Sequence, residues 1–240
     1  MQENHSLQQT VRELEKRNAD LNKRLTSVCM YKDNETGNHI LRVGEISRFL
    51  AEKIGASPEE AELIGRAAPI HDIGKIGVPD SILYKPGQLT LSEFEIAKTH
   101  TLIGGKILND PESIEIEYAR AIALYHHEWW DGNGYPHGLS GADIPLSARI
   151  TAVADVFDVL LSWRPYKEPI SVPMAAKIID RNRGTQFDPA IAAAFTKHIG
   201  EIRELRNHIL QNAPTPEKND NFITDPGRNR AYKAPRFAAP

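Results

Sequence analysis

Apolar residues in the first 31 positions recur at alternating spacings of four and three. Such a heptad pattern, sustained here over about three repeats, is typical of a coiled coil. Asn18 fills the one polar position of the seam, where an asparagine fixes register and favours two strands. The apolar members are Leu7, Val11, Leu14, Leu21, Leu25 and Val28. We expect a helix over residues 1–31 that either pairs with a second copy as a homodimer or packs as an ordinary amphipathic helix.

From residue 32 to about residue 200 the apolar positions follow mainly helical spacing, and no stretch alternates as a half-buried strand would. The run 148–161 predicts a buried helix, whereas residues 81–87 and 131–144 are predicted to be loops. The fold class is therefore predicted to be all-α, a helical bundle. Three signals mark helix starts: Ser57 before Pro58, Thr90 three residues before Glu93, and Asp188 before Pro189.

The segment 211–240 differs in composition from the rest, because prolines are interspersed there with Asn, Asp, Lys and Arg. Such a segment cannot bury enough apolar area to offset the entropy of ordering it. The chain is therefore predicted to have three parts: an N-terminal helix at 1–31, a helical domain at 32–210, and a flexible, proline-rich tail at 211–240.

Composition and charge narrow the possible functions. With 40% hydrophobic and 25% charged residues the balance is that of an ordinary soluble protein, and a net charge of −3 gives no reason to expect bulk nucleic-acid binding. Cys29 is the single cysteine, so an internal disulfide is excluded, and we expect it to be a small apolar filler in a helix. No apolar run approaches the roughly 20 residues of a membrane span and no signal-peptide pattern is present, which predicts a cytoplasmic protein without a membrane partner.

Five of the nine histidines occur in contexts that favour metal ligation. Neutral imidazole and carboxylate are ligand types that first-row divalent metals prefer. Neighbouring residues of a helix point in different directions, so an adjacent pair can serve two ions, which favours a multinuclear centre. The contexts are His39 four residues after Glu35, His71 directly before Asp72, His100 at the end of a predicted helix, and the adjacent His126 and His127.

Two aspartates, Asp155 and Asp158, lie one helical turn apart inside the apolar run 150–160. A buried carboxylate is costly unless it meets a metal, a cation or strong donors. A metal is the favoured partner for Asp155, whereas for Asp158 a metal and a contact with arginine or backbone N–H groups are equally good interpretations. Two close metals suit phosphodiester cleavage, because they activate water and neutralise charge on the phosphoryl oxygens. Lys75, four residues after His71, is expected to face the same site and hold a phosphate.

Two longer motifs carry a resemblance to a known family. Residues 71–80, His-Asp-Ile-Gly-Lys-Ile-Gly-Val-Pro-Asp, are similar to the HD signature, and residues 126–136, His-His-Glu-Trp-Trp-Asp-Gly-Asn-Gly-Tyr-Pro, to the HHExxDGxGYP signature. With His100 between them, they resemble the HD-GYP domain, a bacterial branch of the HD phosphohydrolase superfamily, from about residue 34 to 195. The resemblance implies an all-helical fold, hydrolysis of cyclic di-GMP to pGpG and in some members on to GMP, and two or three divalent metal ions, most often iron and alternatively manganese.

The resemblance also implies roles for individual residues. Lys75 matches a lysine near the scissile phosphate, and Tyr135 lies in the GYP loop (residues 132–136), which shapes the substrate pocket. Arg164 and Lys167 match an element that contacts the substrate. Leu161 stands where the family usually has threonine, and with the bulky Trp163 it is expected to affect substrate fit or loop packing. The implied metal ligands are Glu35, His39, His71, Asp72, His100, His126, His127 and Asp155, of which Glu35 and His39 match the element of three-metal members.

These residues predict a cyclic di-GMP phosphodiesterase with His71, Asp72 and Lys75 as catalytic residues. In this hypothesis metal-bound hydroxide attacks a phosphorus in line and the 3′-oxygen leaves, while Lys75 steadies the phosphate charge. Two alternatives stay open: a cyclic di-GMP sensor or docking module with little catalysis, and a hydrolase of another cyclic dinucleotide. The resemblance further implies an upstream sensor or receiver domain as the source of a signal, and diguanylate cyclases that bind through the GYP loop.

Overall fold

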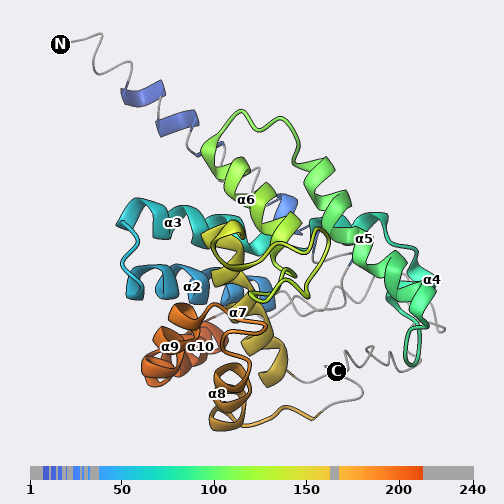
Figure 1. The fold of residues 1–240 in the computed structure, drawn as a ribbon. Coiled ribbons are helices and arrows are strands. Elements are labelled where there is room, and N and C mark those ends of the chain that lie inside the picture. The colour runs from blue at the N-terminus through green and yellow to red at the C-terminus, as the bar shows by residue number, and fades with distance from the viewer. Residues whose placement is uncertain are drawn as a thin grey trace.

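The computed structural model describes residues 38–162 and 168–212, together with scattered positions between residues 8 and 32 (Figure 1). The described residues form helices and no extended strand; one isolated bridge joins Arg183 and Phe187. The predicted all-α fold is therefore confirmed. The α-helices are α2 (Asn38–Lys53), α3 (Pro58–Ala67), α4 (Asp80–Leu83), α5 (Leu91–Ile107), α6 (Ile114–Tyr125), α7 (Leu146–Leu161), α8 (Val172–Arg181), α9 (Pro189–Lys197) and α10 (Ile199–Asn212), and the 3-10 helices are η1 (Ala68–Ile70), η2 (Ile73–Gly77) and η3 (Gly141–Asp143).

Helix α7 is the centre of the bundle. It contacts α2, α6, α8 and α9, and Figure 1 shows α8, α9 and α10 gathered at one end of the molecule, away from α4 and α5. Its sequence is apolar nearly all round, as expected for a helix that is covered on every side. Phe157 and Phe195 meet edge to face with ring centroids 4.9 Å apart, and both side chains are fully buried. Burial on all faces explains why Asp155 and Asp158 need specific partners.

The helix starts predicted from the sequence are confirmed. The Ser57 hydroxyl accepts a hydrogen bond from the backbone N–H of Glu60, and Asp188 accepts from those of Ala190 and Ile191. Thr90 and Glu93 form a reciprocal capping box at the start of α5. Each cap satisfies N–H groups that have no partner within the helix.

Two predicted loops contain short helical segments. Residues 81–87 were expected to be a loop, but Asp80–Leu83 makes one helical turn, because the carbonyl of Pro79 accepts from Ile82 and Leu83. Within 131–144, residues Gly141–Asp143 form one 3-10 turn. Helix α10 continues to Asn212, so the first two residues of the predicted tail are helical, and the rest of the tail lies outside the described residues.

The N-terminal segment is helical at every position that the structure describes. Cys29 is buried in the core and Leu25 packs against it, which confirms Cys29 as an apolar filler in a helix, whereas Leu14 is exposed. The end of this helix near the domain thus behaves as an ordinary amphipathic helix, and pairing with a second copy stays a prediction. Asn18 and four seam residues, Leu7, Val11, Leu21 and Val28, lie outside the described residues. No described helix is long and apolar enough to cross a bilayer.

Candidate metal centre

The pair His71–Asp72 lies in a tight turn between η1 and η2, not on a regular α-helix as the sequence spacing suggested. The turn brings the chain close against α5. A Cβ atom at Gly74 would lie 1.8 Å from the carbonyl oxygen of His100, so only glycine permits this approach. The contact between η2 and α5 therefore sets Asp72 beside His100.

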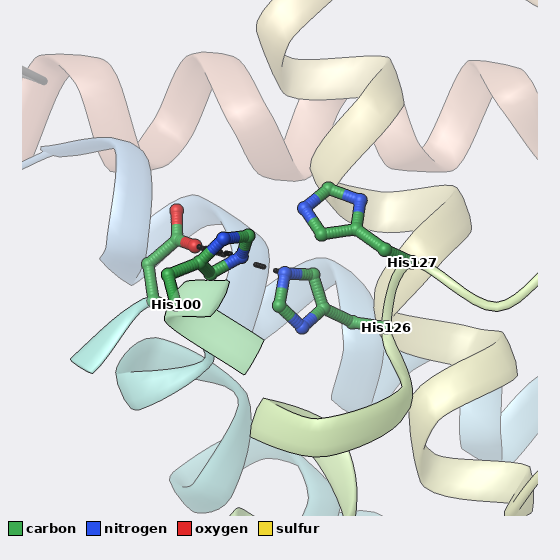
Figure 2. A group of neighbouring side chains, drawn as sticks. His100, His126 and His127 are labelled. Atoms are coloured by element: carbon green, nitrogen blue, oxygen red, sulfur yellow. Dashed lines mark ion pairs between the residues drawn. The ribbon is translucent and has the colours of Figure 1, made fainter. Parts of the chain in front are cut away.

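One group of metal-ligand side chains gathers around Asp72. Its Oδ1 atom lies 3.3 Å from Nε2 of His100 and 3.7 Å from Nε2 of His126. His126 caps the C-terminus of α6 and His127 follows it. Figure 2 shows the rings of His100, His126 and His127 close together, with His100 facing the adjacent pair. One ligand atom from each of Asp72, His100, His126 and His127 lies within 4.8 Å of the others.

A second group contains His39 from α2, His71 from the turn and Asp155 from α7, again with ligand atoms within 4.8 Å of one another. Oδ1 of Asp155 lies 3.3 Å from Nε2 of His39 and 3.9 Å from Nε2 of His71. Oδ2 of Asp72 lies 3.2 Å from Nε2 of His71. Asp72 thus faces the first group with one oxygen and the second group with the other.

Backbone carbonyls orient three of the imidazole rings. Nδ1 of His71 donates to the carbonyl of Ala68 at 2.9 Å, Nδ1 of His100 to that of Ala97 at 2.8 Å, and Nδ1 of His126 to that of Ile122 at 2.9 Å. Because a carbonyl only accepts, the proton resides on Nδ1 and the Nε2 lone pair points into the site. Among the described residues, the buried Nε2 atoms of these three rings and Oδ1 of Asp72 have no hydrogen-bond partner.

The electrostatics of the two groups suit a divalent cation. Burial lowers the pKa of His100 to about 4, and burial with the neighbouring His126 holds the pKa of His127 well below its ordinary value. Burial opposes ionisation of Asp72, but the charges of Lys75 and His71 prevail and keep its pKa well below the usual range. Neutral imidazoles and ionised carboxylates, buried and converging, are the protonation states in which such residues bind metal. The residues present therefore fit one divalent ion in each group.

Burial acts against the charged form of His71 as well, yet Asp72 and Asp155 raise its pKa. A protonated His71 would partly offset the negative charge of Asp72 and Asp155, which is also what a bound cation would do. Lys75 also contacts Asp72. It follows Asp72 by one 3-10 turn, and its Nζ lies 2.5 Å from Oδ2 of Asp72. Lys75 therefore lies beside Asp72 because of a 3-10 turn and not because of the spacing of an α-helix, and its contact with a phosphate stays a prediction.

Glu128 holds the segment that directly follows the GYP loop. Its buried carboxylate accepts hydrogen bonds from the backbone N–H of His137 at 2.7 Å and from that of Leu139 at 3.1 Å. A Cβ atom at Gly134 would lie 2.2 Å from the backbone nitrogen of Trp129. Sequence reasoning assigned Glu128 no role; the signal available was an acidic residue directly after two predicted ligands and before a glycine-rich loop.

Tyr135 packs on the predicted ligands. Its ring stacks on that of His127, with centroids 4.7 Å apart and planes 25° apart, and meets His100 edge to face. Burial raises the pKa of the Tyr135 hydroxyl, so the residue stays neutral. Its contact with substrate stays a prediction. The structure shows that the Tyr135 ring packs against the imidazoles of His127 and His100.

Some predicted site residues are not placed. Glu35, Trp163, Arg164 and Lys167 lie outside the described residues. Leu161 is buried in the hydrophobic core at the end of α7, so its apolar side chain serves packing. Asp158 does not join either group of metal-ligand side chains but binds arginine, which decides between its two interpretations in favour of the structural contact.

Comparison with known proteins places this arrangement in a wider context. The chain is 42% identical over 196 residues to the cyclic di-GMP phosphodiesterase response regulator RpfG of Xanthomonas campestris, covering 82% of this chain and 52% of that protein. It is 39% identical over 204 residues to 3′3′-cGAMP-specific phosphodiesterase 2 of Vibrio cholerae, covering 85% of this chain and 38% of that protein. The chain thus spans about half or less of the length of these relatives.

The fold also has a counterpart among solved structures. A crystal structure of a cyclic GMP-AMP specific phosphodiesterase of V. cholerae superposes with a TM-score of 0.60 at 18% identity, covering 82% of this chain and 54% of that one. At this identity the likeness shows the helical fold alone. The family described as HD domain matches residues 8–191, most of the chain and every predicted metal ligand. With the HD signature at 71–80 on the turn that joins its two groups of metal-ligand side chains, the chain belongs to the HD domain family.

Proposed function

We propose that this chain is a metal-dependent phosphodiesterase that hydrolyses cyclic di-GMP to pGpG. The observation that carries the proposal is the position of Asp72, whose two oxygens face two separate groups of metal-ligand side chains while Lys75 contacts the same carboxylate. The name of the Xanthomonas relative supports cyclic di-GMP as the substrate.

Two divalent ions are proposed, one held by Asp72, His100, His126 and His127 and the other by His39, His71 and Asp155. Glu35 is proposed to add a ligand for a third ion, and iron, with manganese as the alternative, is the proposed metal. When bound, such ions supply a water nucleophile at neutral pH and offset the charge that collects on phosphoryl oxygens.

The side chains of this chain position the diester and its charge. Lys75 is 20% exposed and its ammonium lies at the edge of both groups, where it can bind a non-bridging phosphate oxygen. Arg164 and Lys167 are proposed to bind the phosphate or guanine of the substrate. Tyr135 packs against His127 and His100, and it is also proposed to contact the substrate. No side chain of this chain is proposed as a separate base.

The proposal is tested with purified, chelator-stripped protein that is reloaded anaerobically with Fe(II) or Mn(II) and incubated with cyclic di-GMP. We expect pGpG as the first product, separated by chromatography, and GMP on longer incubation. The variant Asp72→Ala should be inactive, while Asp180→Asn, which alters an exposed aspartate paired with Arg183, should match the wild type. Binding of cyclic di-GMP without turnover under every metal would instead identify the chain as a sensor or docking module.

A second substrate is favoured by a specific observation. The V. cholerae relative that covers 85% of this chain is named a 3′3′-cGAMP-specific phosphodiesterase. A competition assay with both dinucleotides in one reaction distinguishes the two substrates. A higher kcat/KM for 3′3′-cGAMP would show that the second candidate is the better description of this site.

Further parts of the proposal concern partners. The N-terminal helix is proposed to form a homodimer that receives a signal from an upstream sensor or receiver domain. The GYP loop is proposed to bind diguanylate cyclases, and the reaction is proposed to take place in the cytoplasm, where the substrate is a second messenger. Light scattering of the chain with and without residues 1–31 tests the dimer.

A further inference from the structure

Asp158 lies at the centre of a buried network on the side of His39 that faces away from Asp155. Its carboxylate is fully buried in α7, and Oδ2 accepts a hydrogen bond from Nδ1 of His39 at 2.7 Å. Arg42, one turn further along α2, donates from Nε to Oδ1 at 2.5 Å and from Nη2 to Oδ2 at 2.7 Å. Arg206 of α10 donates from Nε to Oδ1 at 3.1 Å. One carboxylate thus connects α2, α7 and α10.

This arrangement sets His39 apart from the other imidazoles of the site. Nδ1 of His71, His100 and His126 donates to a neutral backbone carbonyl three or four residues earlier. Nδ1 of His39 donates to an ionised side chain 119 residues away. A carboxylate acceptor holds the proton on Nδ1 and increases the electron density at Nε2, the atom that faces Asp155.

The two arginines keep the Asp158 carboxylate available for this role. Both of its oxygens are held by guanidinium groups, because Arg42 donates to Oδ1 and to Oδ2 and Arg206 donates to Oδ1. Arg206 adds a second guanidinium to the same oxygen that Arg42 Nε contacts, and its Nη2 lies 3.4 Å from the carbonyl of Leu161. Arg206 therefore links the Asp158 carboxylate to the position of α10 against the end of α7.

We propose that Asp158 is a positioning residue for His39, and that Arg206 makes metal affinity at the His39–His71–Asp155 group dependent on the docking of α10. The inference rests on the proposed function, because it assumes that this group holds an ion. The inference makes metal binding subject to regulation. Displacement of α10 would weaken binding of the ion at the His39–His71–Asp155 group and leave the Asp72–His100–His126–His127 group intact. Asp158 does not touch the reacting atoms, so its effect acts through His39.

The test is a calorimetric titration of the full, chelator-stripped chain with Mn(II), with bound metal counted by mass spectrometry. Asp158→Asn removes the charge and Arg206→Gln removes only the link to α10. We expect about 10- to 100-fold weaker binding at one of the two sites in Asp158→Asn, the range for lost partners of ligating histidines, and a smaller loss at the same site in Arg206→Gln. With Co(II), the visible absorption of one site should shift in both variants.

A matched control uses the second link between α2 and α10. Lys53 Nζ contacts Glu201 Oε2 at 2.8 Å, so Glu201→Gln breaks an ion pair between the same two helices without touching Asp158. We expect it to bind both ions as the wild type does, because the contact between Arg206 and Asp158, on which the proposal depends, is retained. Circular dichroism melting identifies a variant that fails to fold, and if Asp158→Asn does so, Arg206→Gln alone carries the test.

The possible results distinguish failure of this inference from failure of the proposed function. Selective loss at one site in Asp158→Asn and Arg206→Gln, with Glu201→Gln unchanged, supports the inference. Unchanged affinities in a folded Arg206→Gln, or an equal loss in Glu201→Gln, overturn it while leaving the proposed function in place. A wild-type chain that binds no metal overturns the proposed function and this inference together.

Discussion

Lys75 places its Nζ 2.5 Å from Oδ2 of Asp72, the oxygen that also faces His71. The ammonium therefore meets a carboxylate that already serves two groups of metal-ligand side chains. Lys75 is a counterion of Asp72. If two cations neutralised that carboxylate, we expect the ammonium to bind a phosphate oxygen instead. The same pair thus predicts separate effects on metal binding and on turnover.

Replacing Lys75 by methionine should reduce turnover without removing metal. We expect kcat to fall by about 100- to 1,000-fold, the usual effect of losing one charge-stabilising donor, while the metal content stays that of the wild type. Steady-state kinetics with elemental analysis measures both quantities. Lys75→Arg should retain part of the activity, and Lys177→Met, at an exposed lysine of α8, should behave as the wild type. Loss of metal in Lys75→Met would show that the lysine supports the centre and not the substrate.

The bridging position of Asp72 predicts a difference between two aspartates. Asp72→Asn alters a ligand of one group and a neighbour of the other, so we expect it to weaken both ions, whereas Asp155→Asn should weaken only the ion of its own group. Counting bound Mn(II) per chain by mass spectrometry after gel filtration distinguishes the two. Equal metal contents in both variants would contradict the bridging role.

Local features of this chain were accessible from its sequence, because they depend on neighbours along the chain. Thr90 and Glu93, three residues apart, specify their capping box on their own, and the spacing of His126 and His127 already suggested a metal site. The contacts that organise the site are different. Asp158 meets Arg42 across 116 residues and Arg206 across 48, distances over which no periodicity carries information. The bridging geometry of Asp72 depends on a 3-10 turn that helical spacing does not foresee.

Two glycines provide a matched test of the GYP loop. An alanine Cβ at Gly134 would lie 2.5 Å from Cα of Glu128, whereas one at Gly200 in α10 would meet nothing within 4 Å. Gly134→Ala should lower both the melting temperature and the activity, since the loop carries Tyr135 against His127. Gly200→Ala should be neutral or more stable by about 0.4–1 kcal/mol, through the reduced entropy of its unfolded chain. Thermal melts with activity assays measure the contrast, and equal behaviour of the two variants would refute the close packing at Gly134.

The stability of the metal-free protein should depend on pH through His100. Burial lowers the pKa of this imidazole from 6.5 to about 4, so the folded state resists protonation where the unfolded chain accepts it. Between these two values the unfolded state binds more protons, and the free energy of unfolding therefore decreases as the pH falls. His127 acts in the same direction, while the raised pKa of His71 acts in the opposite one.

A comparison with His100→Gln isolates the contribution of this one residue, because the other titrating groups remain in both proteins. From about pH 7.5 to about pH 4.5 the wild type should lose about 2–3 kcal/mol more unfolding free energy than the variant. Urea unfolding of chelator-stripped protein at several pH values measures the difference. Parallel pH profiles of the two proteins would mean that His100 takes up a proton in the folded state, in which case it could not offer Nε2 as a neutral ligand near neutral pH.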